Sequence, residues 1–154
     1  MSMAFSSNPF MECAVQAAQF AAFSQDVPVG AVVVHQGKVI GTGWNRREAE
    51  NRITAHAEMM ALEEACRTLG SWKLNDCDLY VTLEPCSMCA SAIMQARIRA
   101  LYFGAWDPKA GAAGSVIDLF REPWVNHHVT VYEGMMADRC KALLSDFFKN
   151  LRRK

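Results

Sequence analysis

Long apolar runs are missing from this sequence. No stretch approaches the ~20 consecutive apolar residues that a membrane-spanning helix needs. The first ten residues, MSMAFSSNPF, also lack the basic region and apolar stretch of a signal peptide. With 51% hydrophobic and 21% charged residues, the composition is that of a globular protein rather than a disordered or membrane-embedded one. We therefore expect a cytoplasmic protein.

An excess of charge of either sign is missing as well. The 16 Lys and Arg residues balance 16 Asp and Glu residues, which argues against broad, non-specific binding of nucleic acid but not against a local basic patch. The 6 cysteines do not suggest a disulfide framework, because only Cys86 and Cys89 are close in sequence. The other four are expected to be small buried residues: Cys13, Cys66, Cys77 and Cys140.

The spacing of apolar residues and turn residues predicts an alternation of helices and strands. Helices are expected over residues 9–23, 55–69, 86–96 and 135–151. Strands are expected over residues 27–35, 38–44, 78–83, 97–104 and 129–132. The first two strands form an antiparallel hairpin, whereas strands separated by helices are expected to be parallel neighbours. This order predicts an α/β fold, a three-layer α/β/α sandwich around a five-stranded mixed sheet, in one domain spanning residues 1–154.

Signals at the helix ends refine this prediction. Thr54 is expected to cap the helix over residues 55–69, and Gly70 to end it. Pro85 suits the entry to the next helix, because its missing N–H would have no partner there. The polar segment 45–51 and the glycine-rich segment 106–115 are expected to be loops.

Two segments carry residues that bind transition metals, Thr54-Ala-His-Ala-Glu58 and Glu84-Pro-Cys-Ser-Met-Cys89. One imidazole and two thiolates fill three corners of a tetrahedral zinc site and leave the fourth open, which is the pattern of catalytic sites. The partial positive charge at a helix start favours the thiolates that the metal needs. Zinc lowers the pKa of a bound water to about 7. At the first turn of its helix, Glu58 is the candidate that moves protons.

Each half of this pattern, taken alone, also occurs in proteins of other kinds. A Cys-x-x-Cys pair occurs in redox proteins and in structural zinc sites, and His-x-Glu is common by chance. A structural site would need a fourth ligand, for which the candidates are another cysteine, His35, His127 or His128. The two segments together, each opening a helix, favour a catalytic zinc site held by His56, Cys86 and Cys89.

These segments match the pattern His-x-Glu … Pro-Cys-x-x-Cys of the zinc nucleobase deaminases. The chain resembles the cytidine deaminase-like superfamily, and within it the bacterial tRNA-adenosine deaminases, from about residue 9 to residue 153. Further matching pieces are Val27-Pro-Val-Gly-Ala-Val, Gly43-Trp-Asn45-Arg46, Leu79-Tyr-Val-Thr-Leu-Glu-Pro-Cys86, Asp107-Pro-Lys-Ala-Gly-Ala-Ala-Gly-Ser115, Asn126-His127 and Leu144-Ser-Asp-Phe-Phe148.

The resemblance implies a function and a role for individual residues. Enzymes of this kind hydrolyse the wobble adenosine of a tRNA anticodon to inosine and release ammonia. It implies one zinc ion per chain on His56, Cys86 and Cys89, with Glu58 as proton shuttle, and a homodimer. It also implies substrate contacts at Asn45 (flipped-out base or ribose), the Ala57 backbone (base edge), Val29 and Leu83 (apolar wall), Asp107 and Lys109 (anticodon backbone), and Arg46, Arg152, Arg153 and Lys154 (phosphates).

Departures from that pattern keep the substrate open. Arg52-Ile53-Thr54 stands where many relatives have Asp-Pro-Thr, and Ser87 follows the first cysteine where Val or Pro is usual. Residues at the rim of such a pocket select the base and its flanking nucleotides. One alternative is therefore a deaminase of a free nucleobase or nucleoside of the guanine, cytosine or isocytosine type. A second alternative is a non-catalytic, zinc-stabilised RNA-binding module.

Overall fold

A single five-stranded sheet organises the molecule. The computed structural model describes residues 3–152, and its strands lie side by side in the order β2-β1-β3-β4-β5. Their bounds are β1 Gly30–His35, β2 Lys38–Trp44, β3 Cys77–Leu83, β4 Ala100–Ala105 and β5 Thr130–Tyr132. β1 is antiparallel to both β2 and β3, whereas β3, β4 and β5 run parallel. The predicted mixed sheet is confirmed.

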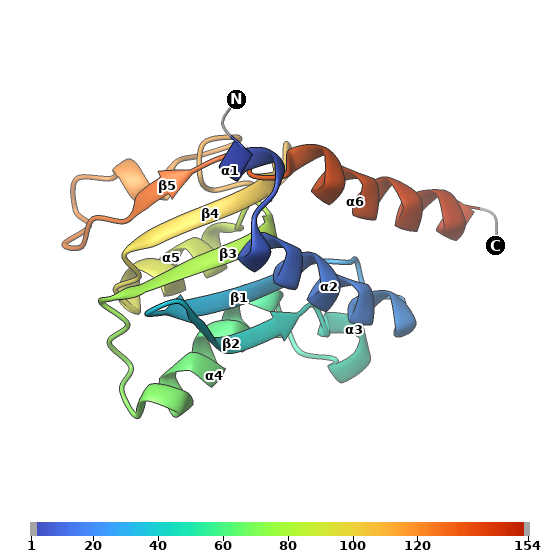
Figure 1. Cartoon of the computed structure of the whole chain (residues 1–154). Helices are drawn as coiled ribbons and strands as arrows, with labels where there is room; N and C mark the ends of the chain where they lie inside the picture. Colours follow the sequence, from blue (N-terminus) through green and yellow to red (C-terminus); the bar gives the residue numbers. More distant parts are fainter. Residues whose placement is uncertain (1–2, 153–154) are drawn as a thin grey trace.

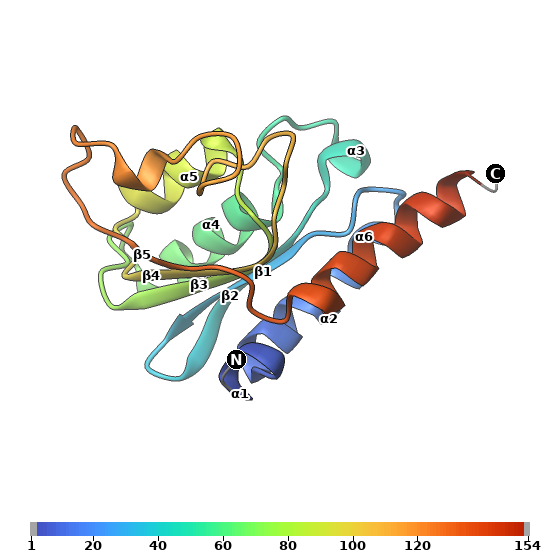
Figure 2. The same ribbon diagram turned by 90° about the horizontal axis from the view of Figure 1, so that it is seen from above.

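Helices cover both faces of this sheet. One face carries α1 (Met3–Ser6), α2 (Pro9–Phe23) and α6 (Ala137–Arg152), and the other carries α4 (Ala57–Leu69) and α5 (Ser87–Gln95), as the edge-on view of Figure 2 shows. The short α3 (Arg47–Glu50) and the 3₁₀ turn η1 (Leu119–Arg121) lie in the connections. The arrangement in Figure 1 is the expected three-layer α/β/α sandwich.

The element boundaries differ from the sequence prediction where the backbone has other partners. β1 begins at Gly30 rather than at residue 27, because the carbonyls of Val27 and Val29 accept hydrogen bonds from Asn45. β4 begins at Ala100 rather than at residue 97, because Arg97 has a φ of 65° and belongs to a turn.

Two further differences concern the segment between β2 and α4. α4 begins at Ala57 with His56 as its N-cap residue, so Thr54 is not its cap. The Ala55 carbonyl instead accepts the N–H of Arg46, which holds residue 55 outside the helix. The expected loop over residues 45–51 contains α3. β2 and β3 are separated by a helix but are not parallel neighbours, because β1 lies between them.

Two glycines let the helices approach the sheet closely. A Cβ on Gly30 would collide with the backbone carbonyl of Ala14 in α2, and a Cβ on Gly43 would collide with that of Ala57 in α4. Tight packing of this kind leaves no room for even one extra methyl group without strain. The close approach at Gly43 places the first turn of α4 directly against β2. This contact fixes the height of the His56 segment above the sheet.

The apolar core lies on both faces of the sheet, with large side chains such as Phe103, Leu79 and Met11 fully buried. Within residues 3–152, no helix combines the length and the apolar character needed to cross a membrane. The cytoplasmic location stays a prediction.

Candidate active site

The candidate site lies where two helices begin beside the end of β3. β3 ends at Leu83, and Glu84 and Pro85 lead directly to Cys86, the N-cap residue of α5. His56 occupies the same position at the start of α4. Both N-cap residues have extended backbones and make no side-chain capping hydrogen bond. Their side chains are therefore free to bind a ligand, in a region where α/β proteins commonly place their sites.

Three donor atoms converge there. His56 Nδ1 lies 3.7 Å from Cys86 Sγ and 3.6 Å from Cys89 Sγ, and all three donor atoms lie within 4.8 Å of one another. Imidazole nitrogen and two thiol sulfurs at this spacing fit one tetrahedral zinc ion. Among residues 3–152 no fourth His, Cys, Asp or Glu belongs to the group. His127, a candidate fourth ligand, contacts the Ile98 carbonyl instead, with Nε2 at 2.8 Å from the oxygen.

The environment of the sulfurs favours one thiolate. Hydrogen bonds from Cys89 and His56 lower the pKa of Cys86 to about 3. The same interaction with Cys86, together with burial, raises the pKa of Cys89. The hydrogen bond to Cys86 raises the pKa of His56 above its ordinary value. A divalent cation at this position would offset the repulsion between two neighbouring thiolates and so allow both cysteines to be deprotonated.

Glu58 lies in the first turn of α4 beside this group. Its side chain is only 4% exposed, and burial raises its pKa to about 7. A carboxyl group with such a pKa accepts and releases a proton near neutral pH, which is the property of a general acid and base. The offset of two residues from His56 does not separate the two side chains, because both line one pocket.

This pocket has a volume of about 240 Å³ and brings most of the predicted substrate residues together. The predicted residues that line it are Val29, Asn45, His56, Ala57, Glu58, Leu83, Cys86 and Asp107. Cys89 is fully buried beneath it, with its sulfur in the metal group. Arg46 and Lys109 do not line it. Sequence reasoning missed four of its lining residues, Val27, Arg47, Glu84 and Ala110.

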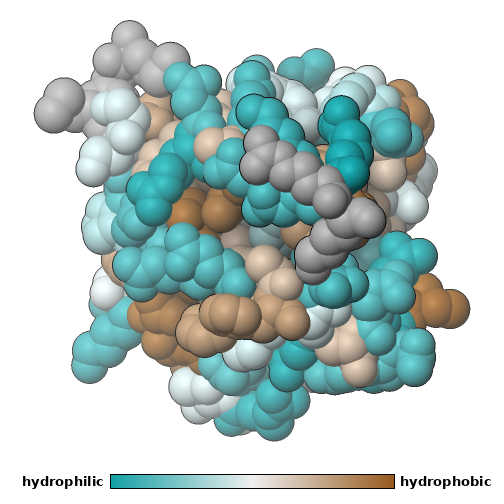
Figure 3. Space-filling model, turned by 90° about the vertical axis from the view of Figure 1, so that its right-hand side faces the viewer, coloured by the Kyte–Doolittle hydropathy of each residue, from teal (hydrophilic) through white to brown (hydrophobic). Residues whose placement is uncertain are grey.

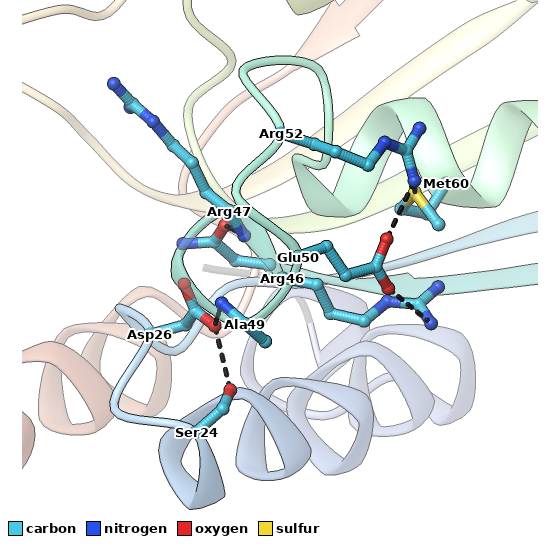
Figure 4. A network of polar contacts seen from close by, with 9 residues as sticks. Ser24, Asp26, Arg46, Arg47, Ala49, Glu50, Arg52 and Met60 are labelled. Atoms are coloured by element: carbon cyan, nitrogen blue, oxygen red, sulfur yellow. Dashed lines mark hydrogen bonds and ion pairs between the residues drawn. The ribbon is translucent and has the colours of Figure 1, made fainter.

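Arg46, the arginine singled out from the sequence, does not line the pocket, whereas its neighbour Arg47 does. The Arg46 guanidinium lies 4.8 Å from the centre of the Trp44 ring and 3.3 Å from the Glu50 carboxylate. Arg47 points the other way (Figure 4), lines the pocket, and its guanidinium forms no hydrogen bond or ion pair with the described residues. A turn decides which of two adjacent arginines faces the pocket, and composition carries no signal for it.

The basic tail is only partly described. Arg152 ends α6 and is exposed, whereas residues 153 and 154 lie outside the described residues. The proposed phosphate contacts of Arg153 and Lys154 stay predictions.

Comparison with known proteins places this geometry in a family. Residues 6–105 match the model of the cytidine and deoxycytidylate deaminase zinc-binding region. The chain is 44% identical to the tRNA-specific adenosine deaminase of Bacillus subtilis over 145 residues, which is 94% of this chain and 90% of the relative.

Two solved structures have the same fold. One, from work on A-to-I editing by tRNA:A34 deaminases at the wobble position of transfer RNA, superimposes with a TM-score of 0.86 at 46% identity and covers 90% of this chain and 100% of the other. Guanine deaminase from Nitrosomonas europaea gives a TM-score of 0.76 at 26% identity, over 90% of this chain and 82% of the other. Both candidate substrate classes are thus represented among similar structures, with the tRNA enzyme the more similar of these two.

The ligand set makes a direct prediction about metal content. Replacing Cys89 with serine is expected to reduce the bound zinc from about one ion per chain to a small fraction, because a neutral hydroxyl is a poor substitute for a thiolate. Metal analysis of the purified protein measures this. The matched control is Cys13→Ser, which should leave zinc unchanged. Cys13 is exposed, so the expectation that it is buried was wrong, whereas Cys77 and Cys140 are buried as expected. Full zinc content in Cys89→Ser would contradict the ligand set.

Proposed function

The chain belongs to the cytidine and deoxycytidylate deaminase zinc-binding family, and we propose that it is a zinc-dependent hydrolytic deaminase that converts the wobble adenosine of a tRNA anticodon to inosine. Residues 1–154 act in this proposal as one deaminase domain. The observation that carries it is a three-ligand metal group beside a buried carboxyl group, in a pocket about the size of one base. The similar proteins named above supply the substrate class.

The reaction replaces the 6-amino group of adenine by oxygen. A zinc ion held by His56, Cys86 and Cys89 would supply Lewis-acid activation of water at neutral pH. Glu58 accepts a proton from the attacking water and donates it to the departing amine, so that water and adenosine give inosine and ammonia. Its pKa of about 7 suits both transfers at neutral pH. Burial of Glu58 excludes bulk water from the proton path.

The remaining lining residues hold the base. Val29 and Leu83 contribute apolar surface to the pocket. Asn45 is fixed in the wall because its Nδ2 donates to the Val27 carbonyl and its Oδ1 accepts from the Arg47 N–H. A primary amide retains one further N–H and one acceptor lone pair after these two bonds. We assign these to the base or ribose, and the Ala57 backbone to the base edge.

A groove beside the pocket favours RNA over a free base. It has a volume of about 450 Å³ and shares Val27, Asn45 and Arg47 with the pocket beside the metal group, which is called the zinc pocket below. Residues of α6, including Phe147 and Phe148, line its other side. On this side of the molecule hydrophobic side chains are visible in a hollow between hydrophilic ones (Figure 3). A deaminase that acts on a single free base does not need a groove that continues past its pocket. A deaminase that acts on a polynucleotide does, because the strand on either side of the target base has to be accommodated.

A homodimer and one zinc ion per chain complete the proposal. The exposed large apolar side chains include Ile53, Val116 and Ile117, with exposed fractions of 78%, 54% and 48%. Burial of such side chains between two copies would remove their apolar surface from water, which is favourable for association. Sedimentation of the purified protein is expected to give the mass of two chains at micromolar concentration, and a monomer there would contradict the dimer.

The proposed function makes a prediction about substrate and proton carrier together. Zinc-loaded protein should release ammonia and form inosine with an anticodon stem-loop that carries a wobble adenosine, and not with free adenosine, guanine, cytosine or isocytosine. Glu58→Gln is expected to lower kcat by about 100-fold or more with zinc content unchanged, because the amide cannot carry the proton. Mass spectrometry of the RNA and an ammonia assay measure both effects.

Each alternative has its own outcome in that assay. Turnover of a free base with an inert stem-loop would retain the zinc chemistry and replace the substrate. Stem-loop binding without turnover, unchanged by Glu58→Gln, would indicate the RNA-binding module.

A second prediction separates the two arginines. Arg47→Ala should raise KM for the stem-loop several-fold and reduce the slope of log affinity against log salt concentration by about 0.7, as expected for one lost phosphate contact on a single strand. Arg46→Ala should leave that slope unchanged, because its guanidinium is bound to Trp44 and Glu50. A slope change in Arg46→Ala alone would restore the assignment made from the sequence.

A further inference from the structure

Two buried carboxylates lie outside the metal group and hold the backbone around the zinc pocket. Asp26 is 0% exposed and Glu84 is 2% exposed. Neither belongs to the cluster of His56, Cys86 and Cys89. Charged carboxylates are rarely buried without compensating partners, so their hydrogen bonds indicate what each one does.

Glu84 binds the loop over residues 107–115. Its Oε1 accepts the N–H of Asp107 at 3.0 Å, and its Oε2 accepts the N–H groups of Ala113 and Ser115, both at 3.0 Å. The Ser115 hydroxyl donates to Oε1 as well. Four donors from one loop therefore converge on a single carboxylate. Although burial alone would raise it, these hydrogen bonds hold the pKa of Glu84 below its ordinary value.

The loop closes tightly around this carboxylate. A Cβ on Gly111 would collide with the Glu84 carboxyl group, so the backbone passes directly over it. The Ala112 N–H also donates to the Pro85 carbonyl at 2.8 Å. Both anchors, Glu84 and Pro85, immediately precede the zinc ligand Cys86. The loop that carries Asp107 into the pocket is thus fastened to the segment that presents the metal.

Asp26 holds a second segment of the pocket wall, residues 45–49, in the same way. Its Oδ1 accepts the N–H of Glu48 at 2.6 Å, and its Oδ2 accepts the N–H of Ala49 at 3.2 Å and the Ser24 hydroxyl at 2.8 Å. Figure 4 shows Asp26 between Ser24, at the end of α2, and Ala49 in α3. The segment fastened in this way includes Asn45 and Arg47, which line both the zinc pocket and the neighbouring groove.

We propose that Asp26 and Glu84 are positioning residues, which hold two walls of the pocket in place relative to the metal group and so contribute to the binding of one nucleotide of the substrate. The proposal rests on the function proposed above, for which the substrate is the wobble adenosine. Neither residue carries a proton in the reaction, because both oxygens of each carboxylate already accept hydrogen bonds from the backbone. Their contribution is made through Asn45, Arg47 and Asp107.

The test compares substrate binding with turnover in Glu84→Gln. The amide nitrogen of glutamine cannot accept hydrogen bonds from the N–H groups that face it. The loop would therefore lose about half of the hydrogen bonds that hold it to residue 84. We expect unchanged zinc content, kcat within about threefold of the original, and KM for the anticodon stem-loop raised about tenfold, because a loop that is no longer anchored has to become ordered when the substrate binds. Hydrogen exchange of the amides of Asp107, Ala113 and Ser115 should become faster in this variant.

Three other variants make the comparison specific. Asp26→Asn keeps one oxygen for the Glu48 N–H, so we expect a KM increase of about threefold and faster exchange at Glu48 and Ala49 only. Ser115→Ala should raise KM, as Glu84→Gln does, but by less. Ser115→Thr should leave KM unchanged because it retains the hydroxyl. Glu133→Gln, at an exposed carboxylate, is the control and should change nothing.

The outcomes distinguish this proposal from its competitors. Unchanged exchange and unchanged KM in Glu84→Gln would overturn it. A fall in kcat with KM unchanged would make Glu84 a proton carrier, and loss of zinc would make it a support of the metal; either result would overturn it as well. If the original protein does not act on the stem-loop, the proposed substrate fails, but the exchange measurements need no substrate and still decide whether these carboxylates hold the walls.

Discussion

The convergence of two helix starts on one small volume is the constraint on which the rest of the structure depends. His56 begins α4 and Cys86 begins α5, and their donor atoms meet within 4.8 Å only if both helices dock at the same end of the sheet. The close approach of α4 to β2 at Gly43 makes this docking possible, because a side chain there would meet the helix backbone. A metal bound to both helices would in turn hold them together.

The same docking places Glu58 in the interior. Two residues after His56, the chain has turned into the helix, and the side chain at that point faces the core rather than solvent. Burial raises its pKa to about 7, so one packing arrangement supplies both the proposed ligand and the proposed acid–base group. Moving α4 outward would expose Glu58 and return its pKa towards that of an ordinary carboxyl group, even with the metal ligands intact.

Local spacing explains why each half of the metal group was predictable from the sequence while the other residues around the pocket were not. His56 with Glu58, and Cys86 with Cys89, are near neighbours in the chain, so a helix start suffices to bring each pair together. The sheet and most helices followed from apolar periodicity for the same reason. The choice between Arg46 and Arg47 depends instead on a single backbone turn that is fixed by Asn45, Asp26 and the Ala55 carbonyl. Asp26 and Ala55 lie outside this turn in the sequence, and no local sequence pattern predicts that they contact it.

The number of hydrogen bonds that each buried carboxylate accepts separates the roles of three chemically similar residues. Asp26 accepts two backbone N–H groups and Glu84 accepts three, and these hydrogen bonds fasten the chain around each carboxylate. Those on Glu84 also hold its pKa below its ordinary value. Burial outweighs the stabilising partners of Glu58, which therefore holds its proton up to neutral pH. A carboxylate saturated with donors is a rigid anchor, whereas one with few donors can exchange a proton. In the proposed enzyme, the two kinds of carboxylate together would give a pocket with fixed walls and a single mobile proton.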